Sequence, residues 1–514
     1  MIRTISNTKT STLIRLWITI TLTTVCSIGA QAQTAEDTVY VYLTDQPNAG
    51  YFIPTPPDSV NIDFVDDLIQ WQWARTQKGT PRGEKASRES VGQPSSMRSI
   101  MAQVLELDTI SDEKTPALSR LLSKAYNTGA QSTAAAKDFV RTRPFGMMNE
   151  EPWALWDKGI SHSSDSYPSD HAACGWATAL AFGEMWPALQ DTIWRRGFEY
   201  GENRVITGAH WQSDVYAGYL CGAASIARAH TNPEFHKDIL AARAEYAALK
   251  GKSADYDPSA EADLPHGEDF LNNPVDTTNY RYLADVMRYW KAKEQRDTER
   301  GDRAASEAEY SEDMMRKVFG EAVGMTLSPE TTPAISELID SILVRSSDTA
   351  DRLKPIRFRK RPFVQLGDPS FVPGDEEKER GKSSFPSGHT NLGWTTALIM
   401  AEVAPDHQDE ILRRGYEYGY NRLIVGYHWA SDIEVTRLLA SALVARLHAD
   451  AEISQLIAKA CAEYKEKATG IEPATRTETT TPTARIYRLD GTPATDTTRG
   501  IIIQNGQKSI RRHF

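Results

Sequence analysis

Residues 413–432 read RRGYEYGYNRLIVGYHWASD, and residues 195–214 read RRGFEYGENRVITGAHWQSD. The two stretches lie 218 positions apart, and the same offset aligns TPRGEKASRES at 80–90 with TERGDRAASEA at 298–308. Similarity of this length at one fixed offset indicates that the chain contains the same structural repeat twice.

The repeats predict an all-α fold. Segments such as 336–354 (SELIDSILVRSSDTADRLK) and 391–404 (NLGWTTALIMAEVA) carry apolar residues at spacings of three and four. They lack the sustained alternation that is typical of strands. The expected organisation, in chain order, is a signal peptide (1–32), a first repeat (33–250), a polar linker (251–267), a second repeat (268–455), a Thr/Pro-rich linker (467–484) and a small C-terminal β module (485–514).

The composition is that of a globular chain with a negative charge. The 514 residues are 40% hydrophobic and carry a formal net charge of −11. This charge argues against nucleic acid or an anionic membrane surface as the general partner, so an anionic ligand needs a local basic patch. No segment beyond the N-terminus approaches the length of a transmembrane helix, and we expect none in the mature protein.

The N-terminus has the features of a secretory signal. Arg3, Lys9 and Arg15 precede an apolar stretch from Leu16 to about Ile28, and small residues follow up to position 32. This order predicts cleavage after residue 32 and export to the periplasm or the cell surface.

The C-terminus predicts a different kind of structure. The stretch 469–484, TGIEPATRTETTTPTA, is typical of an extended linker. Beyond it, turn signals at Asp490-Gly491 and Asn505-Gly506 separate short alternating segments, as in β-strands. Through GIIIQNGQK (500–508) the tail resembles the C-terminal sorting module of type IX-secreted bacterial proteins, which implies a contact with secretion machinery. The alternative is a small accessory β tail.

Three cysteines follow the predicted signal peptide: Cys174, Cys221 and Cys461. Export permits disulfides, but an odd number is no disulfide framework. Cys174 and Cys221 align with Leu392 and Leu439 of the second repeat. We therefore favour small buried hydrophobic residues over a Cys174–Cys221 bridge.

The second repeat contains residues suited to binding a tetrahedral oxyanion. Arg361 and Arg422 offer planar donor forks, and Lys354 offers a point charge. Ser387 and Gly388 precede an apolar helix, so backbone N–H groups at its positive end can face the same anion. The combination predicts a phosphate site.

The remaining polar residues of this repeat predict acid–base and nucleophilic chemistry. His428 and Asp432 are four positions apart, so a carboxylate on the same helix face can hold one ring nitrogen and leave the other as a nucleophile. His389 can then protonate the leaving oxygen. Three nearby cations disfavour a zinc site, and we expect neither metal nor cofactor.

The basic run RLKPIRFRKRP spans 352–362. Its first lysine and last arginine, Lys354 and Arg361, are expected to point into the phosphate site. The other cations are expected to face partly outward and to steer anions toward the site: Arg357, Arg359 and Lys360.

These motifs resemble the type 2 phosphatidic acid phosphatase superfamily, and most closely its class A non-specific acid phosphatases. The phrases SYPSDH, GENRVITGAHWQSDVYAG and KDFVRTRPF carry the resemblance, which covers nearly all of 50–455. It implies hydrolysis of small phosphate monoesters through a phosphohistidine on His428, with His389 as general acid and Asp432 as the orienting carboxylate. The implied phosphate ligands are Lys354, Arg361, Ser387, Gly388 and Arg422. A vanadium-dependent haloperoxidase, or a phosphate- or phospholipid-binding module without turnover, remains an alternative.

The first repeat retains most of this set. At the same offset it has Arg143, Ser169, His171, Arg204, His210 and Asp214. It differs at two positions: Asp170 replaces Gly388, and Lys137 stands one place late relative to Lys354.

An offset of 217 between TPALSRLL (115–122) and TPAISELI (332–339) makes Lys137 the counterpart of Lys354, with one residue missing before Arg143. One residue fewer turns a helical side chain by about 100°, so the lysine either reaches the anion or points away. Asp170 places a like charge beside the anion at a cost of roughly 1–4 kcal/mol, and it is expected to raise the pKa of His171. We expect an impaired first repeat; the alternatives are a partner that only packs on the second repeat and an active site with a different substrate.

Overall fold

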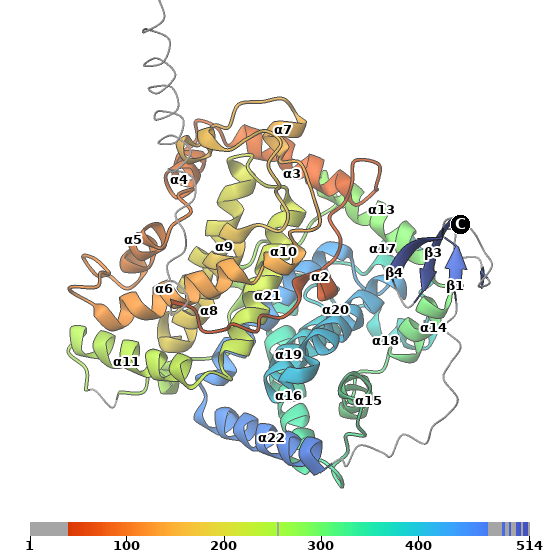
Figure 1. Ribbon diagram of the computed structural model, residues 1–514. Helices are drawn as coiled ribbons and strands as arrows, with labels where there is room; N and C mark the ends of the chain where they lie inside the picture. The colour runs from red at the N-terminus through yellow and green to blue at the C-terminus, as the bar shows by residue number, and fades with distance from the viewer. Residues whose placement is uncertain are drawn as a thin grey trace, which may run out of the picture. The chain divides into compact units, whose positions relative to one another are not determined.

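The structure is a computed structural model that describes residues 40–253 and 256–470, and then 486–488, 493–494, 500–504 and 507–511. The predicted signal peptide lies outside the described residues. Residues 40–463 belong to one compact unit that contains both repeats (Figure 1). The repeats therefore fold against each other and do not form separated domains.

The first repeat consists of helices joined by short connections, and the prediction of an all-α repeat is confirmed. Its longer helices are α3 (Phe64–Thr76), α4 (Pro81–Arg88), α5 (Pro94–Val104), α6 (Pro116–Gln131), α8 (Asp170–Met185), α9 (Gln190–Ile206), α10 (Gln212–Ala229) and α11 (Pro233–Leu249). Its short elements are α2 (Ala49–Phe52), η2 (Ala134–Ala136), α7 (Pro144–Met147), η3 (Leu155–Gly159) and η4 (Pro187–Leu189).

The second repeat reproduces this order helix by helix. Its longer helices are α13 (Arg281–Lys293), α14 (Glu299–Ser306), α15 (Glu312–Val323), α16 (Pro333–Ile356), α19 (Gly388–Val403), α20 (Gln408–Ile424), α21 (Ala430–His448) and α22 (Ala451–Gly470). Its short elements are α17 (Pro362–Leu366), η6 (Pro373–Asp375), α18 (Glu376–Glu379) and η7 (Pro405–His407). Helix α22 takes in the first residues of the predicted Thr/Pro-rich linker.

The linker between the repeats is ordered around η5 (Pro258–Glu261) and α12 (Gly267–Phe270). The guanidinium of Arg446 donates to the backbone oxygens of Ser259, Ala262 and Asp263. A charged side chain from α21 therefore anchors the segment that was predicted to be a free polar connection.

Local capping explains one of the duplicated sequence blocks. The first threonine in each copy, Thr80 or Thr298, is the N-cap of the following helix, and its hydroxyl accepts a hydrogen bond from the backbone N–H three residues on. An N-cap of this kind satisfies a backbone donor that has no partner within the helix. The repeated TxRG phrase therefore fixes where α4 and α14 begin.

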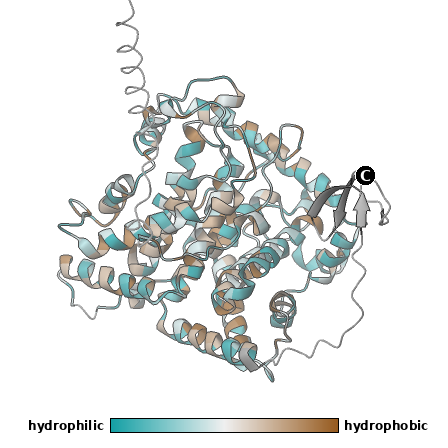
Figure 2. Ribbon diagram, viewed as in Figure 1, coloured by the Kyte–Doolittle hydropathy of each residue, from teal (hydrophilic) through white to brown (hydrophobic). Residues whose placement is uncertain are grey.

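Helices α8 and α19 are the cores of their repeats and are buried along most of their length. Figure 2 shows that the helices of the compact unit mix hydrophobic and hydrophilic residues along their length. Small residues let α19 approach α20 closely: a Cβ added at Gly393 would lie 2.5 Å from the Tyr418 ring, and one at Gly415 would lie 2.2 Å from Ala397. This contact fixes how the start of α19 faces the end of α20.

The two repeats meet through equivalent helices, α10 and α21, and through α3 and α13 (Figure 1). Arg437 Nη1 donates to the hydroxyl of Tyr216 at 2.6 Å, across the buried centre of the unit. At the second contact Arg281 pairs with Asp66, with Nε 2.9 Å from Oδ1. These contacts join the repeats through paired polar groups as well as apolar surface.

Cys174 and Cys221 are free and buried, which confirms the preference for buried hydrophobic residues over a bridge. Cys461 is also free. Within the described residues, no helix has both the length and the apolar character needed to cross a bilayer.

Short strands follow the helices of the compact unit: β1 (Ile486–Arg488), β2 (Pro493–Ala494), β3 (Gly500–Gln504) and β4 (Gln507–Arg511). They pair antiparallel in the order β2-β1-β3-β4. The role of this segment as a sorting module stays a prediction.

The close contact between α19 and α20 generates a test of packing. Gly393→Ala should lower the free energy of unfolding by about 1–3 kcal/mol, because the added Cβ meets the ring of Tyr418 at 2.5 Å. Urea unfolding followed by circular dichroism measures this change. Gly381→Ala is the control, since a Cβ there meets nothing within 4 Å; equal stability of the two variants would contradict the packing described.

Candidate phosphate-binding active site

The second-repeat site forms at the start of α19. Ser387 is its N-cap, and the hydroxyl accepts from the backbone N–H of Thr390 at 3.3 Å. A Cβ added at Gly388 would lie 3.9 Å from Lys354 Nζ and 3.8 Å from the Tyr310 ring. Thus Lys354, from α16, reaches the same turn as Ser387 and Gly388, and glycine leaves the space above the backbone open.

Two buried arginines line this site with unpaired donors. Arg361 is 3% exposed and Arg422 is 4% exposed. Arg361 Nε and Arg422 Nε and Nη1 have no hydrogen-bond partner among the described residues. Burial lowers the pKa of Arg422 to about 10, and the charge of Arg361 contributes to the same shift. Burying cationic donors without partners costs free energy of folding, so an anion bound at this site would stabilise the protein.

His428 has the geometry of a nucleophile. Its Nδ1 lies 2.5 Å from the backbone oxygen of Ser384, and its Nε2 lies 3.1 Å from Arg361 Nη1. A carbonyl only accepts, so Nδ1 carries the proton and Nε2 presents a lone pair. Burial, with the charges of Arg361 and Arg422, holds the pKa of His428 well below its usual range. The lowered pKa favours the neutral ring, in which Nε2 can act as a nucleophile.

We predicted that Asp432 holds the His428 ring, but the structure shows no direct contact between these two side chains; the backbone oxygen of Ser384 holds the ring instead. Its carboxylate accepts from the Ser384 hydroxyl at 2.8 Å, the Trp429 backbone N–H at 3.1 Å and Arg359 Nη1 at 2.5 Å. Because the backbone oxygen of Ser384 binds His428, Asp432 positions the histidine through Ser384. The i, i+4 spacing assumed that both residues lie on one helix, but α21 begins only at Ala430, so His428 precedes the helix.

The prediction that Arg359 faces outward is wrong. This side chain is 7% exposed, and its Nη2 pairs with Asp285 Oδ2 at 2.7 Å in addition to its bond with Asp432. Arg357 is half-buried and donates to the backbone oxygens of Leu271 and Asn272, whereas Lys360 is exposed. Arg359 therefore belongs to the support of the nucleophile, where it balances two buried carboxylates.

His389 lies in the first turn of α19, and its role as proton donor stays a prediction. Its Nε2 lies 2.9 Å from the backbone oxygen of Ala308, which leaves Nδ1 as the second ring nitrogen. The rings of Tyr310 and Tyr418 pack around it, with centroids 5.0 and 5.8 Å away. Burial and the charge of Arg422 hold its pKa well below its usual range.

The first-repeat site has the same layout. Arg143 Nη1 lies 2.9 Å from His210 Nε2, and His210 Nδ1 lies 2.7 Å from the backbone oxygen of Ser166. Asp214 again pairs with a buried arginine, Arg141, at 2.6 Å. Ser169 caps α8, and His171 Nε2 lies 3.0 Å from the Ser90 backbone oxygen. The histidine pair is thus preserved in three dimensions.

Lys137 reaches the first-repeat site. Its Nζ lies 2.8 Å from Asp170 Oδ1 and 2.8 Å from the backbone oxygen of Pro168. In the first repeat α6 ends at Gln131 and η2 precedes the lysine, whereas in the second repeat α16 continues through Lys354. Asp170 therefore pairs with the counterpart of Lys354.

A second carboxylate in the first repeat escaped the sequence analysis. Asp157 accepts from Arg204 Nη2 at 2.5 Å, and both side chains are fully buried. Asp375 occupies the equivalent sequence position in the second repeat but is exposed. The expectation that Asp170 raises the pKa of His171 is wrong, because burial and the charge of Arg204 hold it well below its usual range. Of the three phosphate-site cations of this repeat, Lys137 and Arg204 therefore have carboxylate partners within the chain.

Comparison with known proteins identifies the fold family. The PAP2 superfamily profile matches residues 117–237 and 334–452. A non-specific acid phosphatase of Providencia stuartii is 36% identical over 195 residues, which are 38% of this chain and 79% of that protein. One from Salmonella typhimurium is 34% identical over 200 residues, covering 38% and 80%. An acid phosphatase of Zymomonas mobilis is 40% identical over 136 residues, covering 26% and 52%.

The chain belongs to the PAP2 superfamily. Both PAP2 matches contain a PxxH turn and the Arg–His–Asp block, so the predicted duplication is a duplication of this domain. The resemblance seen in the sequence is thereby confirmed at the level of the superfamily and of its acid phosphatases.

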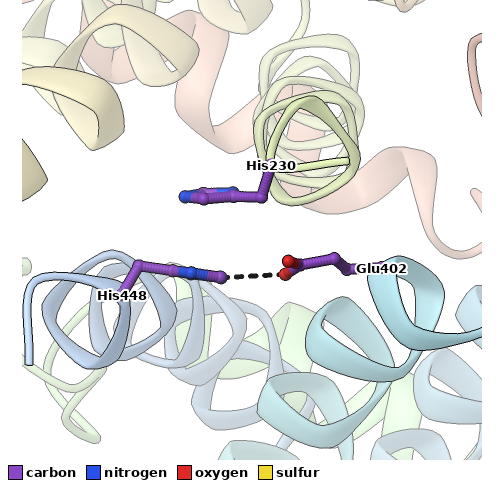
Figure 3. A group of neighbouring side chains, drawn as sticks. All are labelled: His230, Glu402 and His448. Carbon is purple, nitrogen blue, oxygen red and sulfur yellow. Dashed lines mark ion pairs between the residues drawn. The ribbon is translucent and has the colours of Figure 1, made fainter. Parts of the chain in front are cut away.

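A separate cluster of histidines lies where the two PAP2 repeats meet. The rings of His230 and His448 stack with centroids 3.5 Å apart and planes 13° apart. His230 Nε2 lies 2.9 Å from Glu184, and His448 Nε2 lies 3.2 Å from Glu402 (Figure 3). Burial opposes protonation of His230, but Glu184 raises its pKa to about 9.

Ligand atoms of His230, Glu402 and His448 lie within 4.8 Å of one another, close enough to suggest a metal site. Stacked parallel rings do not aim their in-plane lone pairs at one point, so the arrangement fits paired histidine–glutamate contacts better. Within the described residues, neither this group nor Asp191, His266 and Asp269 includes a phosphate-site residue. A metal-free reaction stays a prediction.

The unpaired arginine donors generate a binding test. Inorganic phosphate at 100 times its dissociation constant should stabilise the protein by about 2.7 kcal/mol, because it binds the folded state only. Arg422→Met should abolish most of the resulting increase in Tm. Arg204→Met should leave the increase nearly intact, since Arg204 already pairs with Asp157. An equal loss in both variants would contradict the assignment of the binding site to the second repeat.

Proposed function

We propose that the chain is an exported acid phosphatase that hydrolyses phosphate monoesters at the second repeat. The observation that supports this most directly is the unpaired donor set of Arg361 and Arg422 beside a neutral histidine whose Nε2 is presented as a nucleophile. The acid phosphatases among its relatives support the same reaction class. No observation favours halide oxidation or binding without turnover over this function.

In the proposed reaction the phosphoryl group lies above Gly388. Lys354, Arg361 and Arg422 balance its negative charge, and the backbone at Ser387 and Gly388 faces its oxygens. His428 Nε2 attacks phosphorus and forms the N–P bond as the P–O bond of the ester breaks. The nucleophile needs no general base, because its proton is on Nδ1 and hydrogen-bonded to Ser384.

His389 supplies the proton that the leaving alkoxide needs. Its Nε2–H donates to Ala308, so the transferred proton is on Nδ1. In the second step the neutral ring takes a proton from water, which attacks phosphorus and releases phosphate and free His428. The lowered pKa of His389 means that the protonated form increases as pH falls. Burial lowers the pKa of His428 as well, so the pH profile of turnover should reflect both the protonation of His389 and the neutrality of His428.

The nucleophile assignment gives the first functional test. His428→Ala should lower kcat for p-nitrophenyl phosphate by at least about 1,000-fold, because the covalent step is lost. His210→Ala, the matched change in the first repeat, should retain most activity. Phosphate release measured with and without EDTA also tests the metal-free mechanism. Near-normal turnover by the His428 variant, or EDTA inhibition reversed by zinc, would overturn the proposal.

The impaired first repeat gives a second test. In a His428→Ala background, Asp157→Asn combined with Asp170→Gly should restore phosphate release through His210, because the two changes free Arg204 and Lys137 for the substrate. Asp170→Gly alone should restore less, since Asp157 still occupies Arg204. The restored activity should disappear with His210→Ala. If the combined variant folds and remains inactive, neutralised cations are not what silences the first repeat.

Export and sorting rest on the two chain ends. We propose that residues 1–32 direct export and that the segment from 485 onward directs sorting. A stop codon after residue 470 should preserve phosphatase activity and change the final location, because the described site residues all precede 433. Cell fractionation with activity assays measures both effects. Loss of activity with unchanged location would contradict both halves of this proposal.

A further inference from the structure

An acidic side chain contacts the phosphate-binding arginine of the second repeat. Glu379, the last residue of α18, accepts from Arg361 Nη2 at 2.6 Å through Oε2. Its other oxygen accepts from Lys382 Nζ at 2.8 Å. The Glu379 side chain is 20% exposed, so it lies at the rim of the site.

The first repeat shows that this carboxylate is not needed to orient the arginine. Arg143 Nη1 donates to the Ala209 backbone oxygen at 3.0 Å, as Arg361 Nη1 donates to that of Tyr427 at 3.1 Å. Both arginines also contact the nucleophile position. In the described part of the chain Arg143 has no carboxylate partner, and Ser164 Oγ accepts from its Nε at 2.9 Å. The guanidinium is therefore held in the same way with and without a glutamate.

Glu379 instead occupies part of the donor set that an anion would use. Arg361 Nε is buried without a partner, while Nη2 on the same edge of the guanidinium binds Glu379. A phosphoryl group binds an arginine best through two such donors. Burial raises the pKa of Glu379, but Lys382, Arg361 and Lys354 outweigh it and lower the pKa. The carboxylate is thus an anion within the cationic site.

We propose that Glu379 is an internal competitor for the phosphoryl group. It occupies Arg361 in the resting site, the substrate phosphoryl group displaces it, and it returns to Arg361 as product phosphate leaves. Lys382 remains its partner when it is displaced. The competition weakens binding of phosphate and of phosphate esters alike. The inference rests on the phosphatase function proposed above.

The test uses the full chain with Glu379→Gln and a control on the same helix. Glu377→Gln removes the same charge from a side chain that is 95% exposed and pairs with Arg380. Glu379→Gln should lower the Ki of inorganic phosphate, and the KM for p-nitrophenyl phosphate, by about tenfold, equivalent to about 1.4 kcal/mol. Glu377→Gln should change either value by less than about twofold.

Two outcomes of these measurements would contradict the competitor role of Glu379. If Glu379 instead positions Arg361, Glu379→Gln raises Ki and KM and lowers kcat; if it has no role, the variant matches Glu377→Gln. Either outcome overturns the inference. Glu379→Asp, which withdraws the carboxylate by one methylene, should also lower Ki and serves as the second variant if the glutamine variant fails to fold.

A binding measurement separates this inference from the proposed function. Calorimetric titration of inorganic phosphate into His428→Ala, with and without Glu379→Gln, reports affinity without turnover. If the double variant binds phosphate more tightly than His428→Ala but the wild type hydrolyses no ester, the phosphatase proposal is overturned and the competitor role of Glu379 is supported. If the wild type hydrolyses the ester and the double variant binds phosphate no more tightly than His428→Ala, the phosphatase proposal is supported and the competitor role of Glu379 is overturned.

Discussion

The need to balance buried positive charge governs both sites of this protein. Each PAP2 repeat brings two arginines and a lysine to the start of a buried helix, next to two histidines whose pKa is lowered by burial. Such cations are tolerated only when an anion offsets them. In the second repeat Arg422 keeps unpaired donors, and in the proposed reaction the phosphoryl group supplies the negative charge. In the first repeat Asp157 and Asp170 supply it from within the chain.

This difference is the basis for the proposal that the two sites differ in catalytic competence. Catalysis requires the cationic donors to be stronger partners for the transition state than for anything present at rest. A fully buried carboxylate on Arg204 removes that advantage, while a rim carboxylate on Arg361 only reduces it. Asp157 and Glu379 are therefore two degrees of the same effect. The Asp157 side chain is fully buried, whereas the Glu379 side chain is 20% exposed. On this proposal, the exposure of the carboxylate decides whether substrate can displace it.

The sequence predicted the parts of the structure that depend on periodicity and spacing. The fixed offset identified the duplicated helices, and the motif positions brought Lys354, Arg361, His389 and Arg422 to one place. It could not predict the role of Asp157, because this residue lies on the short 3₁₀ helix η3, and its partner Arg204 lies 47 positions further along the chain. It also misplaced Arg359, since an alternating basic run looks solvated until the buried partners Asp285 and Asp432 are known. Both errors concern residues whose partners lie far away in the sequence.

The contact between the repeats indicates a structural role for the first repeat that does not depend on catalysis. Asp66 on α3 binds Arg281 at the start of α13, and Asp285 on the next turn of α13 binds Arg359 and the backbone N–H of Ser431. Arg359 in turn holds Asp432, which fixes Ser384 and thereby His428. An interface contact from the first repeat therefore lies one helical turn from the residues that orient the nucleophile. This support comes from the helices of the first repeat and does not depend on a ligand in its site, so the first repeat would keep this structural role even if, as we expect, its own site is impaired.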